Sequence, residues 1–268
     1  LSDLIDTGSI PQRLSGSNSG MDAGRLGSML SLALPEARDS ISQAIFRKES
    51  VAADVPDTLN LKEAGSFSQD QTVSLLSCLG FLTIDTDASN KSGKMHWRCP
   101  NEVCYQSFIA CEAEDIGLSR SRSIDLIGVW ERGDIMPLVE ETARRIAGIP
   151  ASAFSGFNER CLQIVFYYTA MDGTDSFLQP ELECDTGSRG RADLFIRNRR
   201  SGGRQYLLEL KYLSEAKGTE SAVASKLGEA KEQLARYRDA PNFKDVKNLD
   251  CWAIVFVNKE PKAVEKLA

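Results

Sequence analysis

The sequence predicts an α/β fold for the C-terminal part of the chain, and three observations carry this prediction. Two apolar segments flank the turn sequence RSGG at residues 200–203, residues 223–237 carry apolar side chains at helical spacing, and residues 251–258 form a continuous apolar run. In addition, residues 158–170 have helical character, and residues 177–183 end in a short strand pattern. The expected order is therefore helix, three strands, helix, strand.

The turn at residues 200–203 is the best hairpin signal in the chain. Asp193 and Glu209 stand at equal distances along the sequence from its centre, so an antiparallel hairpin places them opposite each other. Because side chains alternate along a strand, Lys211 shares their face, whereas the leucines on either side of Glu209 point into a core. The sequence thus predicts two carboxylates and one ammonium group at one place.

This set of side chains suits a specific chemistry. Two carboxylates can hold Mg²⁺ or Mn²⁺ through hard oxygen ligands, and a neighbouring lysine can orient a water molecule or stabilise charge on a phosphate. The same residues also suit a solvated hairpin face with a cross-strand ion pair. The spacing by itself leaves both interpretations open.

The helix expected after the hairpin has a single apolar stripe, formed by Val223, Leu227, Ala230, Leu234 and Tyr237. Gln233 lies about one helical turn before Tyr237. The run CWAIVFVN at residues 251–258 is bounded by polar residues, as expected for a strand with both faces covered. This strand is expected to close the sheet.

The N-terminal part is expected to be mainly helical. Residues 1–28 are rich in serine and glycine and indicate an irregular connector, whereas residues 30–46 have helical apolar spacing. A helix and a hairpin are expected within residues 73–108, and one or two helices within residues 124–146. Residues 148–157, with a proline and several small residues, indicate a linker.

These patterns suggest a division of the chain into three regions. They are an N-terminal helical or irregular region at residues 1–71, an accessory region with a hairpin and helices at residues 72–150, and an α/β core at residues 151–268. No internal repeat is visible in the sequence. The candidate chemical groups all fall in the third region.

Several motifs occur together in this core. They are GRAD at residues 190–193, ELK at residues 209–211, and the pair Gln233 and Tyr237. On elements in the order α-β-β-β-α-β, these residues resemble the PD-(D/E)XK nuclease superfamily. Ala192 stands where the superfamily's name has proline.

A narrower resemblance is to the branch of this superfamily that is usually found behind an AAA-ATPase-like domain. An apolar helix with LL at residues 75–76 precedes GFLT at residues 80–83, and CPNEV follows at residues 99–103. These segments are similar to the branch's apolar helix, "GYLT" strand and "iPNxEV" segment, with Phe81 in place of the tyrosine. The resemblance covers about residues 72–260.

The resemblance implies a restriction-endonuclease-like αβββαβ core with a mainly helical N-terminal accessory region. It implies that Asp193 and Glu209 are metal ligands for Mg²⁺ or Mn²⁺, and that Lys211 positions the nucleophile or the scissile phosphate. Glu159 would lie on the first core helix near the metal, with a helix-capping carboxylate as the open alternative. Gln233 would touch the substrate backbone or orient the lysine.

The net charge of the chain is −6, but the charge is unevenly distributed. Six arginines and a single acidic residue, Asp193, lie between residues 189 and 204. Such a patch can neutralise phosphates locally in an acidic protein. Arg189 and Arg191 are candidate nucleic-acid contacts because they lie beside the expected metal ligands, and the other arginines suit a solvated hairpin tip. Tyr237 is a further candidate contact, with a core position as its alternative.

The cysteines and the single histidine argue against other site classes. The seven cysteines are an odd number with no CxxC pair, which indicates reduced core thiols. His96, Cys99, Cys104 and Cys111 have spacings that match no common zinc pattern, and their segment is expected to form a strand hairpin. With one histidine and no acidic partner suggested by spacing, Ser-His-Asp and Cys-His mechanisms are disfavoured.

The sequence also limits the expected cellular location and binding partners of the protein. No apolar stretch approaches the roughly 20 residues that a bilayer requires, so an intracellular, soluble protein without a membrane partner is expected. No GxxxxGK[ST] loop is present, so ATP binding within this chain is not expected. The chain begins at Leu1, and an upstream AAA-like region or a protein partner is expected. The resemblance also admits an effector or toxin that is delivered into a host cell.

The sequence therefore predicts a PD-(D/E)XK-type nuclease that uses Mg²⁺ or Mn²⁺ to hydrolyse phosphodiester bonds of DNA, with RNA open as a substrate. The alternative is a catalytically silent module of the same fold that binds a partner protein or nucleic acid. The presence of Asp193, Glu209 and Lys211 together favours the nuclease.

Overall fold

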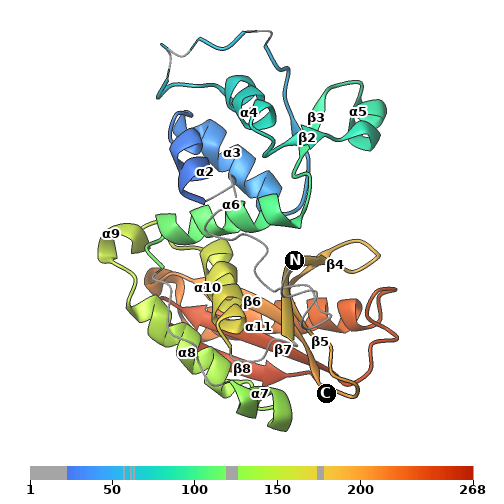
Figure 1. Cartoon of the computed structure of the whole chain (residues 1–268). Coiled ribbons are helices and arrows are strands. Elements are labelled where there is room, and N and C mark those ends of the chain that lie inside the picture. Colours follow the sequence, from blue (N-terminus) through green and yellow to red (C-terminus); the bar gives the residue numbers. More distant parts are fainter. Residues whose placement is uncertain are drawn as a thin grey trace, which may run out of the picture. The chain divides into compact units, whose positions relative to one another are not determined.

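The computed structural model describes residues 23–267, except for residues 57, 61, 63, 119–125 and 174–177. The chain divides into two compact units, Leu1–Glu112 and Ala113–Ala268, called here the N-terminal and C-terminal units. Helices and sheets occur in both (Figure 1), which confirms the mixed α/β class. The connector expected within residues 1–28 lies almost wholly outside the described residues, as do Ile124 and Phe177 at the ends of two expected elements. The three-region division stays a prediction.

The N-terminal unit combines helices with a small antiparallel sheet. Its helices are α2 (Ala23–Leu30), α3 (Pro35–Phe46), α4 (Gln69–Cys78), α5 (Thr86–Ser92) and most of α6 (Glu102–Asp115). Its strands are β1 (Val51–Ala52), β2 (Thr83–Ile84) and β3 (His96–Arg98), in the order β1-β3-β2. The start of α4 is fixed by a capping box, because Ser68 accepts from the backbone of Gln71 and the Gln71 side chain accepts from the backbone of Ser68.

The strand hairpin expected for His96 to Cys111 is wrong. Only His96–Arg98 is a strand, and it pairs with β1 and β2. Helix α6 begins at Glu102, because Oδ1 of Asn101 accepts a hydrogen bond of 3.0 Å from the backbone N–H of Cys104, as a helix-capping side chain does. The CPNEV sequence therefore marks a strand-to-helix junction.

The C-terminal unit is built on a five-stranded sheet. Its strands are β4 (Leu178–Asp185), β5 (Arg191–Asn198), β6 (Gln205–Leu213), β7 (Leu249–Val257) and β8 (Glu260–Lys266), in that spatial order. All neighbours are antiparallel except β6 and β7, which are parallel. The helices are α7 (Ile127–Arg132), α8 (Met136–Ala147), α9 (Ala151–Phe154), α10 (Glu159–Met171) and α11 (Glu220–Arg238). Among the described residues, no helix is long and apolar enough to span a bilayer.

The register of the β5–β6 hairpin is confirmed. Leu194 pairs with Leu208, Phe195 with Leu207 and Ile196 with Tyr206, and each pair is symmetric about the predicted turn centre. In the described ladder the pairing ends at Leu194 and Leu208. Asp193 and Glu209 are thus the first residues beyond the paired region, where the two strands separate.

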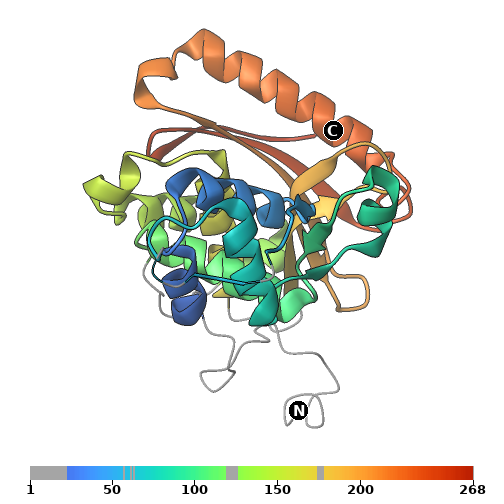
Figure 2. The ribbon, with the colours of Figure 1, turned by 90° about the horizontal axis from the view of Figure 1, so that it is seen from above.

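Helices α10 and α11 cover opposite faces of the sheet. On one face, Phe166 of α10 meets Phe256 of β7 with ring centroids 5.8 Å apart. On the other face, Leu234 of α11 belongs to a buried cluster with Leu207 of β6 and Ala253 of β7. Figure 2 shows α11, in orange, lying along the sheet. Because both faces are covered, the strands that carry the candidate site are buried.

The expectation that residues 251–258 close the sheet is wrong, since β8 pairs with the outer side of β7. The chain reverses at Asn258, whose φ of 55° is in the left-handed region that asparagine tolerates. β8 carries the sequence EPKAVEK. Its charged residues and proline suit an edge strand, because they oppose pairing with another chain.

Candidate active site

Asp193 lies at an interruption of the sheet on both sides. On the β6 side the pairing ends at Leu194. On the β4 side, Leu182 and Cys184 pair normally, but Glu183 between them has a φ of 48°. A left-handed backbone at a glutamate is strained, by roughly 1–3 kcal/mol. Strain of this kind is common at functional sites.

Two donors fix the Asp193 carboxylate, which is 7% exposed as a residue. The amide Nε2 of Gln163, on α10, donates to Oδ1 at 2.6 Å. The backbone N–H of Leu210 donates to Oδ2 at 2.7 Å. The carboxylate therefore joins helix α10 to strand β6 at the point where β5 and β6 diverge.

Glu209 and Lys211 form a buried ion pair beside it. Lys211 Nζ donates to Oε1 of Glu209 at 2.8 Å, and the two side chains are 9% and 1% exposed. Lys211 Nζ also lies 3.6 Å from Oε1 of Glu159, at the start of α10. Oε2 of Glu159 accepts from the backbone N–H of Tyr212 at 3.3 Å. The structure thus brings together Asp193, Glu209, Lys211 and Glu159.

Burial and mutual charge perturb all three central groups. Burial raises the pKa of Asp193 well above its usual range, and the neighbouring Glu209 charge adds to this. Burial raises the pKa of Glu209 to about 7, although Lys211 opposes the shift. For Lys211, burial favours the neutral amine, but the carboxylates of Asp193, Glu209 and Glu159 outweigh it and raise the pKa. Such perturbed groups in one place are typical of a site of chemistry.

The residues fit a hard divalent cation. Oε2 of Glu209 is buried and has no hydrogen-bond partner among the described residues. An oxygen in this state is costly unless something binds it. The described part of the chain holds no group of three or more His, Cys, Asp or Glu side chains that could hold a metal unaided. Mg²⁺ is commonly held by one or two carboxylates together with water and substrate phosphates, so two ligands suffice.

Helix α11 contributes the remaining motif. Burial raises the pKa of Tyr237, the charges of Glu209 and Asp193 add to this shift, and the side chain of Gln233 opposes it. Tyr237 is 6% exposed and belongs to the buried cluster of this face. A Cβ atom on Gly190 would lie 2.8 Å from Cε1 of Tyr237, so glycine is needed for the close approach. Tyr237 is therefore both a core residue and a neighbour of the two carboxylates.

The arginines differ in their surroundings. Arg189 is exposed in the turn before β5, and Arg191 opens β5 and is partly exposed. Neither makes an ion pair with another described residue. Arg204, by contrast, pairs with Asp250 at 3.1 Å. Arg189 and Arg191 thus keep their guanidinium groups available on the loop and strand that lead to Asp193.

Gln163 was not identified from the sequence. It lies within the apolar run of α10, and the contact with Asp193 joins residues far apart in the chain. A usable signal was present, since Gln163 follows Glu159 by about one helical turn and is a lone amide among buried apolar residues.

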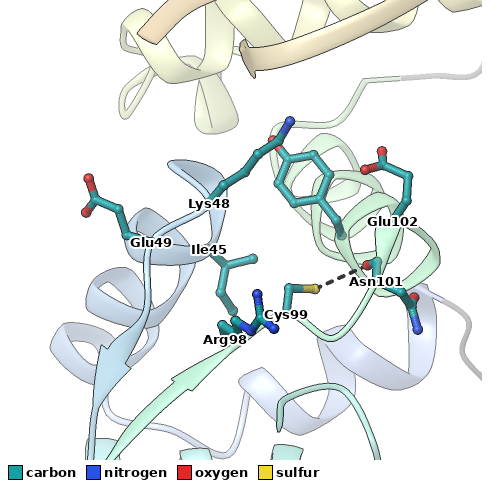
Figure 3. Close-up of a pocket in the computed structure, with 8 residues that line it drawn as sticks. Ile45, Lys48, Glu49, Arg98, Cys99, Asn101 and Glu102 are labelled. Carbon is teal, nitrogen blue, oxygen red and sulfur yellow. Dashed lines mark hydrogen bonds between the residues drawn. The ribbon is translucent and has the colours of Figure 1, made fainter. Parts of the chain in front are cut away.

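The N-terminal unit contains a pocket. This pocket of about 210 Å³ is lined by Ile45, Lys48, Glu49, Arg98, Cys99, Asn101, Glu102 and Tyr105 (Figure 3). Lys48 Nζ lies 5.2 Å from the centroid of the Tyr105 ring, and Glu49 points away from the pocket. Burial, followed by Cys104, raises the pKa of Cys99 to about 12. A thiol that stays protonated is a poor nucleophile at neutral pH. Cys99 therefore does not give this pocket a reactive group.

Comparison with known proteins bears on the C-terminal unit. No curated protein and no solved structure matches the chain. Residues 157–266 match a family model described as PD-(D/E)XK nuclease superfamily. The matched range includes Asp193, Glu209 and Lys211, as well as Gln163. The match supports the resemblance to the PD-(D/E)XK nuclease superfamily over residues 157–266 and points to nuclease activity in general.

Proposed function

We propose that the chain is a metal-dependent nuclease that hydrolyses phosphodiester bonds of DNA. The observation that carries this proposal is the buried set of Asp193, Glu209 and Lys211, in which Oε2 of Glu209 has no protein partner among the described residues. Placing two carboxylates and an ammonium group in a protein interior costs free energy. Solubility does not explain their burial, because the same groups on the surface would provide it. The match of residues 157–266 to a nuclease superfamily model supports hydrolysis of nucleic acid as the class of reaction.

In this proposal Asp193 and Glu209 hold Mg²⁺ or Mn²⁺. The bound ion would activate water and stabilise negative charge on the phosphate. Lys211 stays protonated because three carboxylates raise its pKa, so it supplies a positive charge to the phosphate. Glu159 orients the ammonium group of Lys211 from the start of α10, at 3.6 Å.

The substrate backbone is assigned to a second set of residues. Arg189 and Arg191 bind phosphates in this proposal, because both are accessible and free of ion pairs among the described residues. Gln233 is partly exposed on α11 and lies near Tyr237, so in this proposal these two side chains contact the nucleic acid from α11.

The wider organisation is part of the same proposal. The elements α10, β4, β5, β6, α11 and β7 form a restriction-endonuclease-like core, with β8 as an additional edge strand. The preceding residues form an accessory region that follows an AAA-like region or contacts a partner protein.

A cleavage assay tests the proposal. Wild-type protein should nick or linearise supercoiled DNA with Mg²⁺ or Mn²⁺, and EDTA should stop the reaction. Linear DNA with blocked ends distinguishes internal cutting from end-dependent cutting, and a matched RNA tests the substrate class. A protein that binds DNA but does not cut it with either metal, at micromolar concentration, would contradict the proposal and favour the silent binding module.

A further inference from the structure

We propose that Gln163 is a positioning residue that holds the Asp193 carboxylate in the orientation needed to bind the metal. This inference rests on the proposed function. Gln163 lies on α10 and is 4% exposed, and its Nε2 donates to Oδ1 of Asp193 at 2.6 Å. Gln163 is neither one of the two proposed metal ligands nor the proposed catalytic lysine, and it acts through its contact with Asp193.

The carboxylate determines which way the amide faces. In the structure the NH₂ group of Gln163 points towards Asp193 and its carbonyl oxygen points away, the orientation that suits a metal-binding carboxylate, which when ionised only accepts hydrogen bonds. That oxygen, Oε1, is buried and has no partner among the described residues. A buried amide oxygen without a donor costs stability, so an apolar residue would serve the core of α10 better. Fold stability alone therefore does not account for a glutamine at this position.

The contact with Asp193 does account for it. Oδ2 of Asp193 is already held by the backbone N–H of Leu210 at 2.7 Å. With Gln163 on Oδ1, both oxygens have a fixed donor, and rotation of the carboxylate is blocked. Each oxygen still has a lone pair for a cation. A ligand that is oriented before the ion arrives loses less freedom on binding, which raises affinity.

Helix α10 connects this role to the rest of the site. Glu159 lies about one turn before Gln163 and contacts both Lys211 and the backbone of Tyr212. Residues of the same helix thus contact Asp193 on β5 and Lys211 on β6, on either side of the point where the two strands separate. Outer-shell partners of this kind typically contribute about 10–100-fold to metal affinity or activity.

The test compares Gln163→Met with Thr169→Val. Methionine keeps the length and volume of the side chain but cannot donate to Asp193. Thr169 is a buried polar residue of the same helix, and its hydroxyl donates to the carbonyl of Val165 at 2.7 Å, so it serves as a matched control. Binding of Mn²⁺ to each protein is measured by calorimetry without DNA. Gln163→Met should weaken Mn²⁺ binding about 10–100-fold, and Thr169→Val should leave it unchanged.

A second measurement uses the wild-type protein without metal. The side-chain amide protons of Gln163, observed by NMR, should be protected from exchange with water, and Asp193→Asn should shift their resonances. This readout does not depend on activity or on the folding of Gln163→Met.

The outcomes separate the two proposals. Unchanged Mn²⁺ affinity in folded Gln163→Met, or amide protons that exchange as in an exposed glutamine, would overturn the positioning role while the nuclease proposal stands. A wild-type protein that neither binds Mn²⁺ nor cuts DNA would overturn the nuclease proposal, and the positioning role with it.

Discussion

The pocket of the N-terminal unit and the Asp193 site of the C-terminal unit contain similar side chains in different surroundings. Both combine cations with carboxylates. In the pocket, Glu49 and Arg98 are exposed and Lys48 extends over an aromatic ring. In the site, Asp193, Glu209 and Lys211 are each less than one-tenth exposed.

The difference in burial is the reason why the proposed chemistry is assigned to the Asp193 site and not to the pocket. Exposed charges are solvated by water and cost the fold little, so their grouping carries little information. Buried charges are expensive, and an ion pair in the interior often stabilises less than apolar residues of the same size would. A buried cluster that the fold maintains at this cost is therefore more informative than a pocket lined by exposed charges.

The largest expected effect is on cleavage. Lys211→Met removes the charge next to Glu209 and should lower the rate about 10²–10³-fold at saturating Mn²⁺, because one electrostatic contact to the reacting phosphate is lost. Lys48→Met makes the same change in the pocket and should leave the rate unchanged. Initial rates on supercoiled DNA are measured, with circular dichroism as a check of folding. Equal losses in both variants would remove the distinction between the two clusters.

The next effect concerns binding. Arg189→Ala combined with Arg191→Ala should weaken DNA binding across unrelated sequences and reduce the salt slope by about 0.9 for each lost phosphate contact. Arg199→Ala, at the exposed tip of the hairpin, should change the slope much less. Anisotropy titrations over a salt series give these slopes, using Glu209→Gln as a background without turnover. An unchanged slope in the double variant would place the nucleic acid elsewhere.

A smaller effect is expected on stability. Gly190 has a φ of 124° and lies against Tyr237, whereas Gly202 has a φ of 74° and a Cβ atom added to it would meet nothing within 4 Å. Gly190→Ala should therefore lower the free energy of unfolding by roughly 2–3 kcal/mol, and Gly202→Ala by roughly 1 kcal/mol. Urea denaturation of the two variants measures the difference. Equal losses would mean that Tyr237 moves aside without cost.

The smallest effect is a pH dependence of the metal-free protein. Burial raises the pKa of Glu209 from 4.5 to about 7, so the folded state favours its neutral form. The stability that this group contributes is present below pH 4.5 and is lost as the pH rises through about 7. The melting temperature of the wild type should therefore fall relative to Glu209→Gln between these pH values, in the presence of EDTA. A constant difference would show that Glu209 is ionised throughout.

The hairpin and its register could be predicted because both depend on local signals. The turn sequence fixes the loop, and alternation along the strands fixes which residues face each other. Asp193, Glu209 and Lys211 could therefore be grouped from the sequence. The ion pair of Lys211 with Glu209 follows from the same pattern, because the two residues share a face of β6.

Other features depend on contacts that the sequence pattern does not encode. Gln163 was missed because its partner is on another element, and helical periodicity does not show which strand residue a helix residue meets. β8 was missed because its charges and proline resemble a loop, although an edge strand tolerates both. The hairpin expected near residue 99 was wrong because the capping bond of Asn101 favours a helix.

Where the backbone pairing of β5 and β6 stops, the N–H of Leu210 donates to the side chain of Asp193 and not to a backbone carbonyl. The same carboxylate oxygen thus satisfies the backbone of the sheet and belongs to a proposed metal ligand. The substitution Asp193→Asn would keep an oxygen for that N–H but lose the charge and the acceptor that Gln163 uses, whereas Asp193→Ala would leave the main-chain donor unbonded in the interior. Even a variant without the proposed activity would therefore need an oxygen-bearing side chain at position 193 to satisfy the backbone of the sheet.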